Sequence, residues 1–287
     1  MKVIEIISNL YNELSSNLSE GIIPIQLRPS SLVGTVQDDP FDSWVGDEIR
    51  QSIPELEVFH AGKLTTPDLI LREPRNNTIV GLEVKKLIQQ ENGKDPRGLT
   101  IDYNSCLPCG KALIKIGNDT VEIPCFYLFA LLSPDSLSMV TTIIMDGDFL
   151  NYDFDLHKDA KYANQSEYKH GPYGEGSVRH RRMYTYPNPL NYKLKFFHLR
   201  HILVIKKHDL SDVDMDIPCT DLIVRNDKYN NSFHYVVLDN NSEKNLQLDK
   251  LPVRRDIFKS CKNRKPKART ASMPHLPIIS EEHAKIY

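Results

Sequence analysis

The chain has 287 residues, 40% of them hydrophobic and 26% charged, and a formal net charge of −2 at pH 7. This composition is typical of a globular protein with a large core, and it excludes a globally basic nucleic-acid-binding protein. No apolar run approaches the roughly 20 residues of a membrane span, and acidic residues interrupt the N-terminal apolar pattern, so we expect no membrane partner and no signal peptide. Five cysteines, an odd number, favour a reducing compartment and a cytoplasmic location.

Two segments carry apolar residues at helical spacing, Val3 to Leu14 and Phe41 to Ile53. Residues 15–40 between them mix turn formers with short apolar pieces and predict an irregular arm. Asp42 or Ser43 is suited to cap the second helix.

Strand patterns follow these helices along the chain. The predicted strands are residues 56–61, the two arms of residues 66–86, residues 112–116 and 121–123 joined as a hairpin, residues 125–132, 139–145, 222–225 and 232–238. Residues 193–207 are apolar enough for the core, as either a helix or a strand. Residues 146–164 predict a short helix or an edge strand, because aromatic residues interrupt the spacing of a calcium loop. We therefore expect an α/β fold with a mixed central β-sheet flanked by helices.

The stretch TPDLILREPRNNTIVGLEVKK, residues 66–86, predicts two apolar strands joined by a polar turn. Glu83 and Lys85 share one face of the second strand, because successive side chains alternate. If the strands pair, Asp68 lies beside Glu83, and two carboxylates meet an ammonium. Paired carboxylates suit Mg²⁺, which polarises a phosphoryl oxygen and lowers the pKa of a bound water. The lysine is suited to position that water and to offset developing charge.

Pro67-Asp68 followed by Glu83-Val84-Lys85 resembles the PD-(D/E)xK nuclease motif. The order of a helix, a strand with PD and a strand with ExK is similar to that of type II restriction endonucleases. The resemblance implies a restriction-endonuclease-like core with extra β-hairpins and loops. It implies that Asp68 and Glu83 hold Mg²⁺, with Mn²⁺ as a substitute, that Val84 offers its backbone carbonyl to the metal and that Lys85 acts on the attacking water.

The helix before the PD strand contains Glu48. In many nucleases of this family a glutamate from that helix reaches the metal site or lies just behind its ligands, which makes Glu48 a candidate catalytic residue. The alternative is a solvated acidic helix face. An ExK sequence by itself also occurs on solvated sheet faces, but here it ends an otherwise apolar strand, where unpaired charge is costly.

Two loops carry side chains that suit contacts to phosphates and base edges. The first follows the ExK strand, and the second is a glycine-rich stretch with an arginine cluster near residues 170–186. The alternatives are a structural turn and a solvated basic hairpin. The candidate DNA-binding residues are Asn104, Ser105, Lys111, Arg179, Arg181, Arg182 and Tyr184.

Residues 1–256 are expected to form a single nuclease domain, with a catalytic core near 41–145 and DNA-contacting elements near 165–256. Residues 257–287 predict a flexible basic tail.

The leading hypothesis is a Mg²⁺-dependent type II restriction endonuclease that makes sequence-specific double-strand cuts in unmethylated DNA. The expected partners are double-stranded DNA, a second copy of the chain in a homodimer, and a DNA methyltransferase acting on the same site. The alternatives are a repair or recombination nuclease of the same superfamily, a DNA-binding protein without catalysis, and a purely structural domain.

Overall fold

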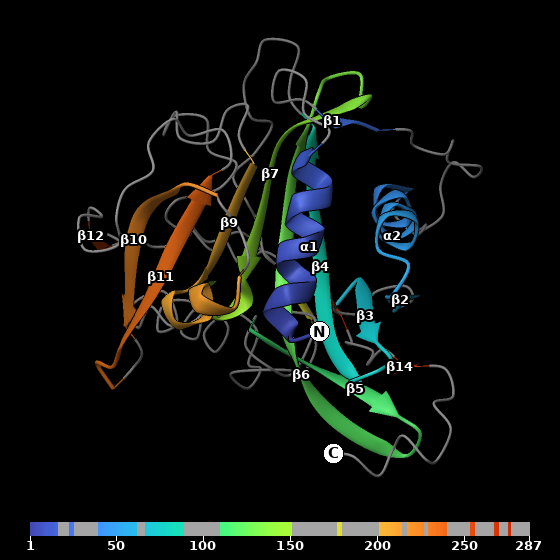
Figure 1. Ribbon diagram of the computed structural model, residues 1–287. Coiled ribbons are helices and arrows are strands. Elements are labelled where there is room, and N and C mark those ends of the chain that lie inside the picture. Colours follow the sequence, from blue (N-terminus) through green and yellow to red (C-terminus); the bar gives the residue numbers. More distant parts are fainter. Residues whose placement is uncertain are drawn as a thin grey trace.

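The computed structural model shows a mixed α/β protein with a large central β-sheet (Figure 1). It describes residues 1–16, 23–25, 40–61, 67–88, 110–150, 177–179, 201–213, 217–226, 229–239, 253–255, 267–269 and 275–276. Within these residues no helix is long and apolar enough to cross a membrane.

The helices are α1 (Val3–Ser16) and α2 (Pro40–Ser52), with the 3-10 helices η1 (Gly147–Leu150) and η3 (Lys207–Asp212). The longer strands are β2 (Glu57–His60), β3 (Leu69–Glu73), β4 (Thr78–Ile88), β5 (Lys111–Ile116), β6 (Asp119–Leu132), β7 (Ser138–Asp146), β9 (His201–Lys206), β10 (Cys219–Asn226) and β11 (Ser232–Asp239). The short strands are β1 (Ile23–Pro24), β8 (Ser177–Arg179), β12 (Val253–Arg255), β13 (Lys267–Arg269) and β14 (His275–Leu276).

The main path of the sheet runs in the order β12-β10-β11-β9-β7-β6-β4-β3-β2. Three pairs along this path are parallel, namely β4 with β6, β7 with β9 and β10 with β12, and the others are antiparallel. Strands β1, β5 and β14 pair off this path, and β8 and β13 form a separate ribbon. The coarse prediction of a mixed sheet flanked by helices is therefore confirmed.

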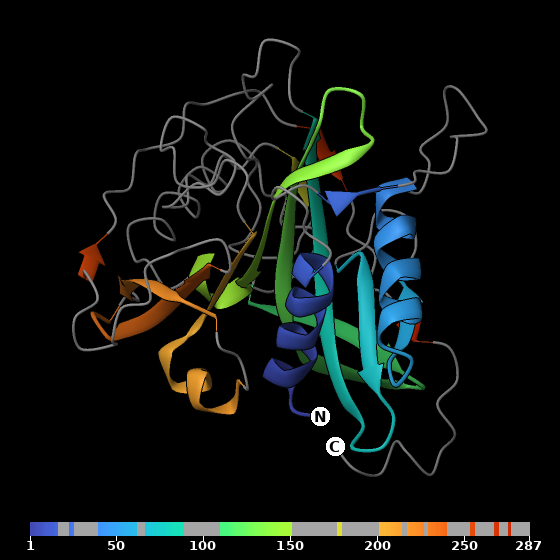
Figure 2. The same cartoon turned by 45° about the horizontal axis from the view of Figure 1, so that its top comes forward.

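Both helices pack on one face of the sheet. In Figure 1 and Figure 2, α1 lies over the middle strands and α2 lies nearer the β2 edge. Ile7 and Leu10 of α1 are buried in one cluster with Leu82 of β4 and Leu203 of β9. A second cluster, on the opposite face, includes Tyr127, Phe129, Met145, Ile202 and Tyr235. Because strand residues alternate, Leu82 on the helix side puts Glu83 on the opposite side.

The two predicted helices and the predicted hairpins are confirmed. The predicted N-cap at Asp42 or Ser43 is wrong, because α2 begins at Pro40 and includes both residues. The separate strands predicted at residues 121–123 and 125–132 are wrong, since both belong to the continuous strand β6. Pro124 does not end this strand, because it lies where β6 changes partners. Lys111 of β5 is opposite Pro124, and pairing with β4 begins at the next residue, Cys125.

Residues 201–206, within the stretch that allowed a helix or a strand, form β9. The short helix allowed within residues 146–164 is η1, and residues 151–164 lie outside the described part of the chain. In the segment predicted as a flexible tail, β13 pairs with β8 and β14 pairs with β5. The domain division itself stays a prediction.

Candidate active site

The β3–β4 hairpin brings Asp68 next to the strand that carries Glu83, as predicted. The two strands are antiparallel with Leu69 opposite Leu82, so that Asp68 enters β3 beside Glu83. The backbone N–H of Val84 donates a hydrogen bond of 2.7 Å to Asp68 Oδ2. This bond fixes the Asp68 carboxylate against the middle of β4.

Asp68, Glu83 and Lys85 form one charged cluster. The Lys85 ammonium forms an ion pair with Glu83 Oε1 and lies 3.8 Å from Asp68 Oδ2. The Glu83 side chain is only 1% exposed, whereas those of Asp68 and Lys85 are each 23% exposed. The cluster therefore has a buried side and a side open to solvent, and its two carboxylates and one ammonium give it a net negative charge.

The neighbouring strand β6 supplies an aromatic wall to this cluster. Tyr127 lies opposite Glu83 and Phe129 lies opposite Lys85, and both rings are almost fully buried. The two rings stack with centroids 5.7 Å apart and an interplanar angle of 18°. Such surroundings exclude water on one side, which strengthens electrostatic interactions within the cluster.

The residues present fit a Mg²⁺ ion. Mg²⁺ prefers oxygen ligands, is commonly held by one or two carboxylates and keeps several waters. The Asp68 and Glu83 carboxylates and the Val84 backbone carbonyl provide oxygen atoms of this kind. Among the described residues, including those of this cluster, there is no group of three or more His, Cys, Asp or Glu side chains that could hold a metal. A two-carboxylate site of this type needs no such group.

Glu48 lies on α2 and is half-buried. Partial burial, and secondarily the adjacent Asp47, raise the pKa of Glu48 above its ordinary value. Helix α2 buries Val45 and Ile49 in the cluster on the helix side of the sheet, whereas Glu83 is on the opposite side. The participation of Glu48 in the metal site stays a prediction.

Two of the predicted DNA-contacting residues fall within the described part of the chain. Lys111 is exposed on β5 and forms an ion pair with Glu122 of β6. Arg179 ends β8, opposite Lys267 of β13. The others lie outside the described residues: Asn104, Ser105, Arg181, Arg182 and Tyr184.

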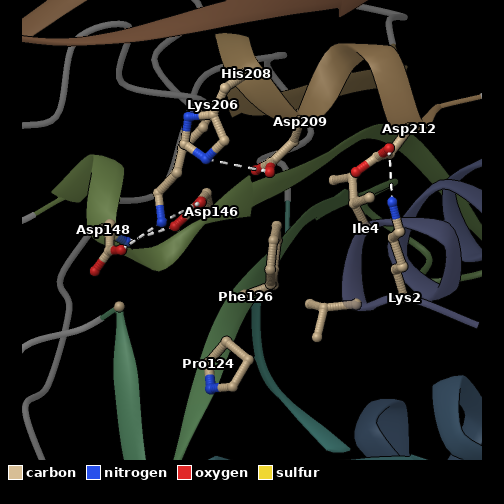
Figure 3. A pocket seen from close by; sticks show the side chains of 12 residues that line it. Lys2, Ile4, Pro124, Phe126, Asp146, Asp148, Lys206, His208, Asp209 and Asp212 are labelled. Carbon is tan, nitrogen blue, oxygen red and sulfur yellow. Dashed lines mark hydrogen bonds and ion pairs between the residues drawn. The ribbon is translucent and has the colours of Figure 1, made fainter. Parts of the chain in front are cut away.

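The sequence analysis missed a second charged cluster, which lines a cavity of about 320 Å³ (Figure 3). Lys206 Nζ lies 2.7 Å from Asp148 Oδ2 and 3.4 Å from Asp146 Oδ2. Figure 3 shows these three side chains together, with Lys2 and Asp212 across the cavity. Burial raises the pKa of Asp146 to about 7, although the Lys206 ammonium opposes this shift.

A signal for this second cluster is present in the sequence. Asp146 and Lys206 each end an apolar strand. The sequence predicts the ExK residues at the end of their strand too, but they lie within β4, which continues to Ile88. Strands β7 and β9 are parallel, so these ends lie at the same edge of the sheet. That parallel pairing was not predictable from the sequence, because some 55 residues separate the two strands.

No family model matches this sequence, and a search of curated proteins finds no significant match.

Proposed function

We propose that this protein is a Mg²⁺-dependent type II restriction endonuclease, which hydrolyses phosphodiester bonds at specific sites in unmethylated double-stranded DNA. The observation that carries the proposal is the convergence of Asp68, Glu83 and Lys85 on β3 and β4. These residue types occur in the order and spacing that the PD-(D/E)xK motif requires, and the cluster is partly open to solvent.

The fold proposed for the core is restriction-endonuclease-like. It is supported by the succession of helix α2, the PD residues at the start of β3 and the ExK residues on β4. It is also supported by the parallel pairing of β4 with β6, which makes the ExK strand an interior strand of the sheet.

In the proposed reaction Asp68, Glu83 and the Val84 carbonyl would hold the metal. When bound, Mg²⁺ supplies Lewis-acid polarisation of the phosphoryl group and a water of lowered pKa. Lys85 would orient the attacking water and offset the negative charge that develops on the phosphoryl oxygens. The water oxygen bonds to phosphorus, one bridging P–O bond breaks, and the leaving oxygen takes up a proton. The products are a phosphate monoester and a hydroxyl group.

The proposal includes a homodimer, because a protein with two-fold symmetry matches a palindromic site. It also includes a DNA methyltransferase that protects the same site in the host DNA. Sequence reading is assigned to the segments of residues 102–111 and 170–186, which are rich in hydrogen-bonding and basic side chains.

Digestion of unmethylated phage DNA in the presence of Mg²⁺ tests the proposal. The wild-type protein should give discrete bands, and Lys85→Ala should give none, because it lacks the ammonium that acts on the attacking water. A loss of at least about a hundredfold is expected for a group of this kind. Lys2→Ala, which removes an exposed lysine outside the cluster, should keep the cutting activity within an order of magnitude.

Other outcomes point to the alternatives. Random smearing that Lys85→Ala abolishes would retain the hydrolytic site and favour a repair or recombination nuclease. Absence of cutting by either protein, with DNA binding retained, would contradict a nuclease and favour a DNA-binding protein. In that case Asp68→Ala should leave Mn²⁺ binding unchanged, whereas a nuclease should lose Mn²⁺ affinity with this substitution.

A further inference from the structure

Gly81 of β4 lies directly beneath the ring of Pro67. A Cβ atom added at position 81 would lie 2.7 Å from Cγ and 3.1 Å from Cβ of Pro67. The first of these distances is shorter than real Cβ contacts allow. The next nearest atom, Cys125 Sγ, would be at an ordinary distance of 3.5 Å. The crowding at this position therefore comes from Pro67 alone.

The backbone of Gly81 does not explain the glycine. Its conformation is one that any L-amino acid adopts, unlike that of Gly117, whose φ is +59°. The lack of a side chain at position 81 is required by space, because it lets the segment before β3 approach β4 closely.

Pro67 cannot relieve a contact at position 81 by changing rotamer. Its ring is closed on its own backbone nitrogen, so that ring and backbone must move together. The next residue is Asp68, whose Oδ2 accepts the 2.7 Å hydrogen bond from Val84 N–H and lies 3.8 Å from Lys85 Nζ. A displacement of the Pro67 ring is thus transmitted directly to the Asp68 carboxylate.

We propose that Gly81 is a positioning residue of the candidate metal site, acting through Pro67. The Pro67 ring packs into the space that a side chain at position 81 would occupy. This packing holds Asp68 close enough to β4 for its carboxylate to share a cation with Glu83. The inference rests on the proposed function in so far as that cation is a divalent metal. Functional constellations tolerate shifts of only about 0.5 Å, and the contact at Gly81 is tighter than ordinary contact by more than that.

The test compares Gly81→Ala, Pro67→Ala and the double variant with the wild-type protein. Two properties are measured on each: Mn²⁺ affinity by electron paramagnetic resonance, and the chemical shift and hydrogen exchange of the Val84 amide by NMR without metal. Gly81→Ala should weaken Mn²⁺ binding by about tenfold or more, as when groups that orient metal ligands are removed. It should also accelerate exchange at Val84, because its acceptor moves away.

The double variant should recover both properties to within about threefold of Pro67→Ala alone. The 2.7 Å contact with the ring Cγ is then absent, and only the milder 3.1 Å contact with Cβ of residue 67 remains. A matched control is Gly46→Ala on α2, where an added Cβ would lie 3.0 Å from the His60 ring. This variant crowds the helix side of the sheet, and it should leave Mn²⁺ affinity and the Val84 amide unchanged even if it lowers stability.

Wild-type values of both properties in Gly81→Ala would overturn the inference, as would a double variant no better than Gly81→Ala. If Gly81→Ala does not fold, the double variant and Pro67→Ala decide: similar Val84 exchange in both supports the inference, and faster exchange in the double variant overturns it. If the wild-type protein binds no Mn²⁺, the proposed function fails, whereas the Val84 measurements still decide whether Gly81 positions Asp68.

Discussion

Glu83 and Asp146 are both carboxylates held almost fully out of water beside a lysine. Glu83 is 1% exposed and Asp146 is 4% exposed. Burying a charge without a partner is costly, and an ion pair with Lys85 or Lys206 offsets only part of that cost. A buried carboxylate of this kind lowers the free energy of unfolding, and this cost is a reason to look for function at Glu83.

At Asp146 this cost predicts a specific pH dependence. Burial raises its pKa to about 7 from an ordinary value of 3.8. The folded protein therefore holds this proton more tightly than the unfolded chain does. The contribution of Asp146 to the free energy of unfolding is greatest below about pH 4, falls as the pH rises to about 7 and is then level. The full change is at most about 4 kcal/mol.

Asp146→Asn should remove this contribution. Urea unfolding between pH 4 and pH 8 should show a flatter pH dependence for the variant than for the wild-type protein. Asp119→Asn, which changes an exposed carboxylate at the start of β6, is the control and should keep the wild-type dependence. An unchanged slope in Asp146→Asn would show that Asp146 titrates alike in the folded and unfolded states.

Among the elements, the β5–β6 hairpin depends on its turn. Gly117 has a φ of +59°, and an added Cβ would meet nothing within 4 Å. Any cost of a side chain there comes from the backbone conformation and not from packing. Gly117→Ala should lower the free energy of unfolding by about 1 kcal/mol, measured by urea denaturation.

Gly117→Asn is the matched variant, because asparagine tolerates this left-handed conformation better than alanine does. Its loss of stability should be clearly smaller. Equal losses in the two variants would mean that backbone strain is not the cause. Neither substitution should alter Mn²⁺ affinity, since the turn is separate from β3 and β4.

At the scale of the whole molecule, a net charge of −2 leaves no general attraction to DNA. Affinity must arise where basic residues cluster, and Arg179, Arg181 and Arg182 form the densest arginine group in the two segments proposed to read DNA. Replacing all three by alanine should weaken DNA binding. It should also reduce the slope of the logarithm of the association constant against the logarithm of salt concentration by about 3, since each arginine that pairs with a phosphate adds about 1 to this slope.

Fluorescence anisotropy with a labelled duplex at several salt concentrations measures this slope. Lys2→Ala is the control. The Lys2 ammonium forms an ion pair with Asp212 on the helix side of the sheet, whereas Glu83 lies on the opposite side. An unchanged slope in the triple variant would exclude phosphate contacts by these arginines. No salt dependence in the wild-type protein would favour a structural domain over any DNA-binding function.

The local elements and the candidate site were predictable from the sequence. Helical spacing in α1 and α2, the turn residues between β3 and β4, and strict alternation around Glu83 and Lys85 are properties of neighbouring residues. Once β3 and β4 pair as a hairpin, their short connection leaves little choice of register, so the approach of Asp68 to Glu83 followed from the sequence as well.

The tertiary structure decided which distant strands meet. Apolar strands such as β6, β7 and β9 carry similar patterns, and the pattern alone does not choose among their possible partners or orientations. The parallel pairing of β7 with β9 brings Asp146 and Lys206 into contact. Strand β6 continues through Pro124 because it pairs with β5 up to this residue and with β4 after it. The packing of the Pro67 ring against Gly81 likewise forms only when Pro67, just before β3, lies over β4. Alternation and turn chemistry act over a few residues, whereas these contacts depend on the packing of the entire sheet.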